Sequence, residues 1–263
     1  FLAGPSSSGK TSTAYRLAYA LRSYGIIPRV ISADNYYLDY ADRRIDENGN
    51  PDFESIYALD LDKFNDDMQA LMRGEEVELP YYNFKTGKRE YNGNIIDLGD
   101  KDILIVEGIH CLNEQFSYSI PSDKKYKLCV SALPPLNIDE HNRLTSSDLR
   151  LIRRLVRDDR SRAHNAALTL RKWPDVRKGE EDNIFPYTET ADKILNTAIL
   201  YELAAIKPFA ERILFGVPRD SDEYFKAKEL LKILDFVIPI STDLIPAHSI
   251  VREFIGGSCL NVG

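Results

Sequence analysis

Apolar and polar positions alternate along the chain in blocks that predict strands and helices in turn. The clearest apolar run, at residues 103–108, is typical of a strand that is buried on both faces. Weaker runs predict further strands at residues 1–3, 28–32, 126–132 and 191–196. Between these runs, apolar residues recur every three or four positions, as in amphipathic helices. Such helices are expected at residues 11–22, 61–72, 147–162, 201–214 and 222–234.

This alternation of strands and helices predicts an α/β fold with a mostly parallel sheet and flanking helices. Two polar stretches interrupt it: residues 41–53 predict a loop, and residues 78–97, rich in Tyr, Gly and Asn, predict a β-hairpin excursion. Residues 238–263 are expected to end in loops. We find no repeat or clear linker, so a single domain over residues 1–263 is expected.

Composition narrows the class of protein. Of 263 residues, 43% are hydrophobic and 29% charged, which is ordinary for a globular protein, and the net charge is −7. An acidic chain is a poor general binder of nucleic acid. Because no apolar run approaches the roughly 20 residues of a membrane span, no membrane partner is expected. Three scattered cysteines, Cys111, Cys129 and Cys259, predict free thiols in a cytoplasmic protein.

Residues 4–11, GPSSSGKT, match the phosphate-binding P-loop pattern G-x-x-x-x-G-K-[ST]. Glycine lets the backbone approach a phosphate closely, and successive backbone N–H groups then converge on its oxygens. Lys10 would supply a point charge for the β- and γ-phosphates of ATP, and the Thr11 hydroxyl a ligand for Mg²⁺. The residues expected to bind the nucleotide through this loop are Gly4, Ser6, Ser7, Ser8, Gly9, Lys10 and Thr11.

Two carboxylates follow predicted strands. Asp34 is expected to hold Mg²⁺ through water or to accept a proton from an attacking hydroxyl, unless it only caps a turn. Glu107 ends the strand at residues 103–108, where an acid orients Mg²⁺ or its water shell, unless it is a solvent-facing acid. Together with Thr11, these carboxylates are the predicted metal ligands.

Arginines crowd the predicted helix at residues 147–162. With interspersed aspartates they fit a salt-bridged surface, yet guanidinium groups also suit phosphate oxygens, so a lid over residues 147–190 is expected. The aromatic stretch at residues 79–84 fits either a wall for a flat base or packing within the hairpin.

Seven ordered blocks between Gly4 and Asn196 resemble those of the uridine kinase (uridine–cytidine kinase) family of P-loop kinases. They are GPSSSGKT (4–11), SADNYY (32–37), DFESIYALD (52–60), LPYYNFKTGKR (79–89), ILIVEGI (103–109), RLIRRLVRDDRSR (150–162) and FPYTETADKIL (185–195). The tail IVREFIGGS (250–258) is similar to the ending of longer bacterial nucleoside kinases, which carry an upstream TGS-like domain. The resemblance implies a P-loop NTPase three-layer sandwich with an arginine-rich lid and a helical tail over residues 200–263.

The resemblance also implies roles for single residues. Asp34 would be the general base for the nucleoside 5′-hydroxyl, with Lys10 and Arg157 as catalytic partners. The nucleoside would contact a set of seven residues: Asp34, Tyr37, Glu54, Tyr82, Arg89, Arg154 and Arg157. Arg154 and Arg162 would also bind the nucleotide.

This chain departs from the family pattern where the base is recognised. Glu54 stands where the family has a sugar-binding Asp, Gly87 aligns with its base-contacting His, and His164 with its last lid Arg. The expected reaction is transfer of the ATP γ-phosphoryl group to the 5′-hydroxyl of a uridine-like nucleoside, in a protein that could form a homo-oligomer. The alternatives are a kinase for another hydroxylated metabolite, of pantothenate or phosphoribulose type, and a non-catalytic ATP-binding regulatory module.

Overall fold

The computed structural model describes residues 1–43, 54–135, 137–162 and 164–260, and these form two compact units. Unit 1 comprises residues 1–4, 14–129 and 179–194, and unit 2 comprises residues 5–13, 130–178 and 195–263. The loop expected at residues 41–53 falls almost entirely outside the described residues. A single-domain organisation stays a prediction.

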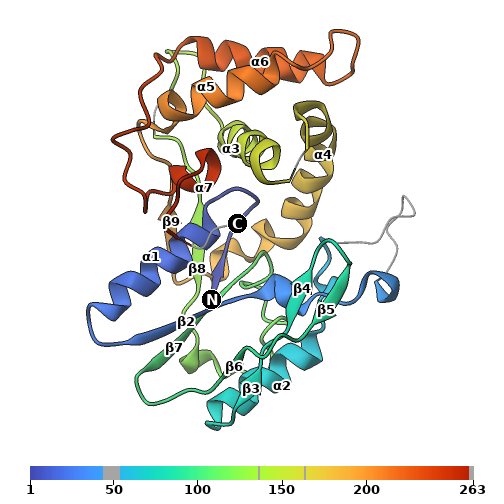
Figure 1. Ribbon diagram of the computed structural model, residues 1–263, viewed down its shortest axis with the longest axis vertical. Helices are drawn as coiled ribbons and strands as arrows, with labels where there is room; N and C mark the ends of the chain where they lie inside the picture. The colour runs from blue at the N-terminus through green and yellow to red at the C-terminus, as the bar shows by residue number, and fades with distance from the viewer. Residues whose placement is uncertain (44–53, 136, 163, 261–263) are drawn as a thin grey trace. The chain divides into compact units, whose positions relative to one another are not determined.

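A parallel sheet forms the centre of the fold (Figure 1). Its strand order is β2-β7-β1-β8-β9, and the pairs from β2 through β8 are parallel. The strands are β1 (Leu2–Ala3), β2 (Ile27–Ser32), β7 (Asp102–Glu107), β8 (Leu128–Ser131) and β9 (Lys193–Asn196). This arrangement, with flanking helices, confirms the predicted α/β fold.

The predicted helices are present within two residues of their expected limits. They are α1 (Lys10–Arg22), α2 (Leu61–Met72), α3 (Ser146–Ser161), α5 (Glu202–Leu214) and α6 (Tyr224–Asp235). Two further helices were not predicted, α4 (Ala166–Asn183) and α7 (Val251–Ile255). The expectation that the tail ends in loops was therefore wrong at α7. Short 3₁₀ turns complete the fold: η1 (Ala33–Tyr36), η2 (Tyr40–Asp42), η3 (Ile56–Ala58), η4 (Ser122–Lys124) and η5 (Phe185–Thr190).

The hairpin excursion is confirmed as two small antiparallel pairs in unit 1. Strand β3 (Val77–Glu78) pairs with β6 (Ile95–Ile96), and β4 (Tyr81–Asn83) pairs with β5 (Lys88–Glu90). The turn between β4 and β5 contains Gly87 at a φ of +70°, a left-handed conformation that favours glycine.

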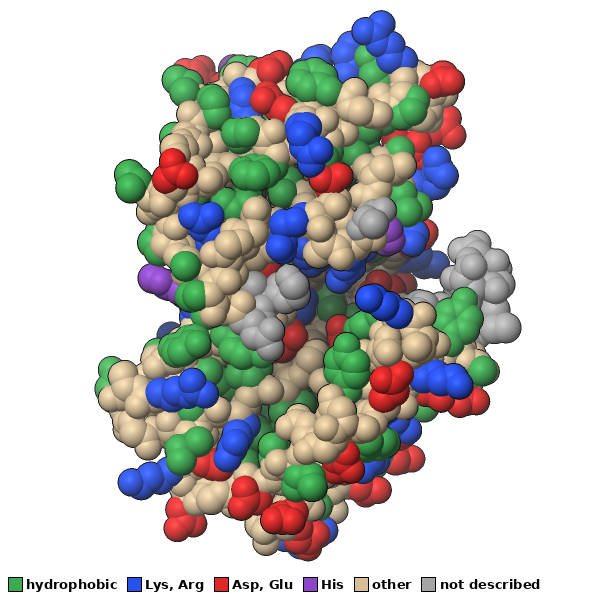
Figure 2. Space-filling model, in the orientation of Figure 1, with side chains coloured by type: hydrophobic (Ala, Val, Ile, Leu, Met, Phe, Trp, Pro, Cys, Tyr) green, Lys and Arg blue, Asp and Glu red, His purple; other side chains and the backbone are tan. Residues whose placement is uncertain are grey.

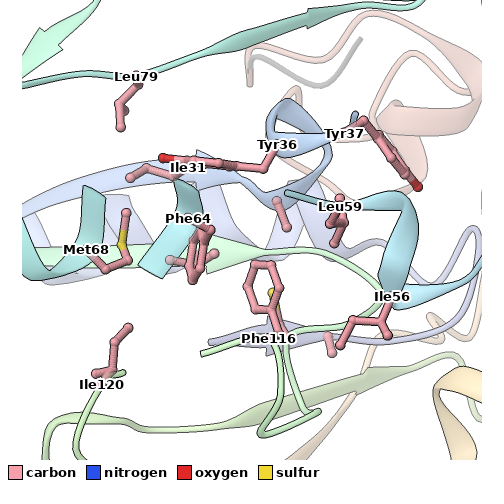
Figure 3. Packing of buried hydrophobic residues seen from close by; sticks show 14 of the residues in the cluster. Ile31, Tyr36, Tyr37, Ile56, Leu59, Phe64, Met68, Leu79, Phe116 and Ile120 are labelled. Carbon is pink, nitrogen blue, oxygen red and sulfur yellow. The ribbon is translucent and has the colours of Figure 1, made fainter. Parts of the chain in front are cut away.

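The core of unit 1 is built around aromatic side chains of α2 and the loops after the strands (Figure 3). Phe64 of α2 stacks on Phe116 with ring centroids 4.1 Å apart. The rings of Tyr36 and Phe64 pack in a T shape with centroids 5.1 Å apart. The Tyr36 hydroxyl donates to Asp67 of α2 over 3.1 Å. Because Tyr36 ends η1, this packing fixes the turn that carries Asp34.

Unit 2 packs helices α3, α5, α6 and α7 and the first part of α4 around one apolar cluster. A buried ion pair lies beside it: Arg153 Nη2 is 2.6 Å from Glu202 Oε2, and the two side chains are 0% and 2% exposed. A guanidinium group so deeply buried requires a charged partner, because desolvation of an unpaired charge is very costly. The pair anchors α3 to the start of α5.

We expect Phe64→Ala to lower the free energy of unfolding by about 3–5 kcal/mol, because it leaves a cavity against Phe116. The matched control is Phe225→Ala in α6, since Phe225 is 81% exposed and such a change is expected to stay within about 0.5 kcal/mol. Denaturant unfolding of the two variants makes the comparison. Equal losses would contradict the described core.

Candidate active site

The loop between β1 and α1 has the backbone conformation of a phosphate cradle. Gly9 has a φ of +86°, and Ser7, at +57°, is the one non-glycine residue with positive φ among the described residues. Alternation between left- and right-handed conformations turns successive N–H groups toward one side, which makes an anion-binding nest. A strained φ at serine is typical of a functional site held in place by its surroundings.

The carbonyl groups of this loop receive hydrogen bonds from other parts of unit 2. Arg150 Nη1 donates to Ser6 O over 3.1 Å, and Arg153 Nη1 donates to Ser7 O over 3.2 Å. The Thr197 hydroxyl donates to Ser8 O over 2.5 Å. Three consecutive carbonyls of the loop thus accept hydrogen bonds from residues outside it. These bonds stabilise the conformation in which the loop N–H groups point away from the carbonyls.

Lys10 and Gly9 have the positions that the motif predicts. Lys10 begins α1, and its ammonium group donates to Pro5 O over 3.2 Å, so the charge lies across the loop. A Cβ at Gly9 would lie 2.8 Å from Ile250 Cγ2, so the position excludes larger residues by space as well as by φ. Thr11 follows in the first turn of α1.

Helix α3 uses its arginines in two ways. Arg150 and Arg153, 1% and 0% exposed, support the loop from its outer side. Arg154 reaches the loop through Ser6 Oγ at 2.9 Å. The helix is therefore not only a salt-bridged surface. Sequence reasoning did not assign Arg150 and Arg153 this supporting role, because their partners are distant in the chain.

Buried Asp158 contacts the three lid arginines that were predicted to bind the phosphates or the nucleoside. Arg154 Nε and Arg157 Nη2 each lie 3.2 Å from its carboxylate, and Arg162 Nε lies 3.7 Å away. One buried carboxylate thus brings three guanidinium groups together in a protein whose net charge is −7. The spacing of Arg154, Asp158 and Arg162, four residues apart, was the available sequence signal. Their binding of phosphate stays a prediction.

In unit 1, Asp34 and Glu107 belong to the same edge of the sheet. Ser32, at the end of β2, is in register with Glu107, at the end of β7, and Asp34 follows in η1. Glu107 is 8% exposed. A Cβ on Gly108 would lie 2.6 Å from Ala33 Cβ, so this glycine allows the chain after β7 to pass close to η1.

An aromatic cluster lies after η1. Tyr37 and Tyr82 meet edge to face at 5.5 Å, and Phe84 contacts Tyr82 at 5.0 Å. The guanidinium group of Arg43 lies over both tyrosine rings, at 4.5 Å and 4.9 Å, a contact that sequence reasoning missed. Burial, followed by the charges of Asp34 and Glu54, raises the pKa of Tyr37 well above its usual range. Its phenol therefore stays neutral and retains a proton to donate.

Glu54 and Arg89 also lie in unit 1. A Cβ on Gly179 would come within 2.8 Å of Glu54 Cγ, so the Glu54 side chain lies directly on the last turns of α4. Arg89 Nη1 is 2.7 Å from Asp60, the residue that caps α2. The roles of Glu54, Arg89, Tyr37 and Tyr82 in binding a substrate stay predictions.

Gly87 has a structural reason to be glycine. Besides its positive φ, its carbonyl accepts from Tyr40 N over 2.8 Å, and a Cβ would lie 3.0 Å from Tyr40 Cβ. A histidine placed here would strain the turn. The glycine that stands where the family pattern has a histidine therefore has a local physical cause.

The chain contains oxygen donors of the kind that Mg²⁺ prefers, the Thr11 hydroxyl and the carboxylates of Asp34 and Glu107. Within the described ranges, no group of three or more His, Cys, Asp and Glu side chains forms a metal site by itself. Mg²⁺ is usually held by one or two carboxylates together with substrate phosphates, so oxygen donors of this kind suit it chemically. The binding of Mg²⁺ by these three residues stays a prediction.

A family model described as "Phosphoribulokinase / Uridine kinase family" matches residues 1–200. The chain belongs to this family. It is therefore a phosphotransferase with an alcohol group as acceptor and a small molecule as substrate. Membership also implies the use of ATP.

Individual relatives agree with the family. A uridine kinase of Oceanobacillus iheyensis is 30% identical over 195 residues, 74% of this chain and 83% of the relative. A uridine kinase of Staphylococcus aureus is 28% identical over 74% of this chain and 84% of the relative. The structure of a possible uridine kinase from Bacillus stearothermophilus is 19% identical, covers 74% of this chain and 86% of that one, and has a TM-score of 0.47.

Two further observations concern the described helices and the surface. Among the described helices, none combines the length and the apolar character that crossing a bilayer demands. Figure 2 shows acidic and basic side chains interspersed over the surface in view.

We expect Gly108→Ala to lower kcat by roughly 10- to 100-fold, because the added Cβ must displace Ala33 and with it Asp34. The matched control is Gly99→Ala, since a Cβ at Gly99 meets no described atom within 4 Å. Steady-state kinetics of both variants provide the measurement. Wild-type turnover in Gly108→Ala would show that the close approach of Gly108 to Ala33 does not matter for catalysis.

Proposed function

We propose that the protein transfers the γ-phosphoryl group of ATP to the 5′-hydroxyl of a pyrimidine nucleoside, with uridine-like bases preferred. The observation that carries the donor half is the phosphate loop, whose three outer carbonyls are held by Arg150, Arg153 and Thr197. The acceptor half is supported by a uridine kinase that is 30% identical to this chain over 83% of its own length.

On the donor side, the loop N–H groups and Lys10 bind the β- and γ-phosphates. The arginines around Asp158 add positive charge for the charge that develops during transfer. Thr11 and Glu107 would hold Mg²⁺, which neutralises phosphate charge when bound. Since phosphoryl transfer needs little covalent help from the protein, positioning and charge supply most of the catalysis.

On the acceptor side, the 5′-oxygen attacks the γ-phosphorus, its proton passes to an Asp34 carboxylate oxygen, and ADP leaves. Asp34 suits this role because η1 is fixed by the contact of Tyr36 with Asp67. The charges of Asp34 and Glu54 both contribute to the raised pKa of Tyr37, after burial. We assign Glu54 to the ribose hydroxyls and the neutral Tyr37 to the nucleoside.

The test is ADP release with ATP and Mg²⁺ against a panel of acceptors. The panel contains uridine, cytidine, 5-methyluridine, adenosine, pantothenate and ribulose 5-phosphate. The proposal expects turnover with the pyrimidine nucleosides. Turnover with a non-nucleoside alcohol alone would replace the substrate class, and ATP binding without any turnover would indicate a regulatory module. The panel is a better test of base choice than Gly87→His, which would strain the turn at Gly87.

Asp34→Asn should reduce kcat by roughly 100-fold or more, because it keeps the size of the side chain and removes the proton acceptor. The affinity for ATP·Mg²⁺, measured by calorimetry, should change little. Lys10→Ala is the contrasting variant, since it removes the positive charge that acts on the phosphates. It should lower kcat to a similar degree. If the ATP·Mg²⁺ affinity of Asp34→Asn falls in step with kcat, Asp34 is a metal ligand and not the base.

A further inference from the structure

We propose that the C-terminal segment, residues 250–257, holds the phosphate loop in its nucleotide-binding conformation, with Glu253 as the positioning residue. The inference rests on the proposed function in one respect, that the loop binds ATP. The segment contains α7 and lies beyond residues 1–200, which the family model matches. It belongs to unit 2, as does the loop from Pro5 onward.

The central contact joins Glu253 to Ser12. Glu253 Oε2 accepts from Ser12 Oγ over 2.6 Å and from Ser12 N over 3.4 Å, and Glu253 is 6% exposed. Ser12 lies in the first turn of α1, two residues after Lys10. The N–H groups of a first helical turn have no partner within the helix, and a carboxylate there is favoured by the helix dipole. Glu253 thus fixes the turn that carries Lys10 and Thr11.

A second contact reaches the loop itself. Ile250 Cγ2 would be only 2.8 Å from a Cβ on Gly9, so the segment packs on the loop with no room for a larger residue. Ile250 is 4% exposed. The last glycine of the motif therefore faces this C-terminal segment, which keeps the loop from opening toward that side.

Arginines of α3 hold the segment in place. Arg160 Nη2 donates to Glu253 O over 2.9 Å, and Arg160 Nε donates to Phe254 O over 3.2 Å. The guanidinium group of Arg153 lies 5.0 Å from the centre of the buried Phe254 ring, while the same group donates to Ser7 O. One arginine thus contacts both the phosphate loop and the C-terminal segment.

The glycine pair explains how the segment ends. Gly256 and Gly257 have φ values of +95° and +74°, which favour glycine. A Cβ on Gly256 would lie 3.3 Å from Arg160 Cδ, and one on Gly257 would lie 3.3 Å from Arg252 Nη1. Arg252 in turn donates to Thr242 O and Ile245 O. Arg252, Glu253, Phe254 and the two glycines therefore all take part in docking the segment.

The experiment is a double-mutant cycle with Ser12→Ala, Glu253→Ala and the double variant. ATP·Mg²⁺ affinity is measured by calorimetry, and KM is measured separately for ATP and for the acceptor. Each single change should weaken ATP binding by roughly 5- to 20-fold, the range for a hydrogen bond to a charged group. The double variant should be no weaker than the more severe single one, because both lose the same contact. The acceptor KM should stay unchanged.

Glu223→Gln is the matched control, since Glu223 is also a buried glutamate of unit 2 and pairs with Arg171 at 2.7 Å. It should lower the unfolding temperature without changing ATP affinity. If Glu253→Ala does not fold, Ser12→Ala alone carries the test, since it removes the hydroxyl that donates to Glu253 Oε2. Wild-type ATP affinity in the Glu253 variant, or effects that multiply in the double variant, would overturn the inference. Failure of the wild-type protein to bind ATP would instead overturn the proposed function.

Discussion

A loop that turns its N–H groups toward a phosphate must direct its carbonyl groups elsewhere, and the fold of unit 2 depends on satisfying them. Ser6, Ser7 and Ser8 present three consecutive carbonyls, and Arg150, Arg153 and Thr197 donate to them. A buried carbonyl without a donor would cost about as much as a lost hydrogen bond. The donors therefore stabilise the strained φ of Ser7 before any nucleotide binds.

This requirement explains why arginines of α3 are buried. Arg153 has no exposed surface, and its charge is balanced by Glu202 at 2.6 Å. Its remaining donors are used on Ser7 and Thr197. Farther along the helix, Asp158 holds Arg154, Arg157 and Arg162 together. One helix thus supports the loop from its outer side and concentrates positive charge within a chain whose net charge is −7.

Local patterns in the sequence predicted most of the strands and helices, because period-two and period-3.6 patterns are local properties. Helix α4 was missed because Pro174 and Gly179 weaken its helical signal. The contact between Ser12 and Glu253 spans 241 residues and has no local signature. The interpretation of Gly87 as a lost base contact came from the resemblance to the family pattern. Its φ of +70° shows that the turn itself favours glycine at this position. The P-loop was predictable because its residues are contiguous, while its supports are not.

The most direct measurement is a calorimetric titration of the wild-type protein and of Thr197→Val with ATP·Mg²⁺. The substitution keeps the shape of a side chain that is 2% exposed and removes the hydroxyl that donates to Ser8 O. The account predicts that the wild-type protein binds ATP·Mg²⁺ and that Thr197→Val, still folded by circular dichroism, binds roughly 10-fold more weakly. Equal affinities in the two proteins would contradict the claim that these outer hydrogen bonds set the loop for its ligand.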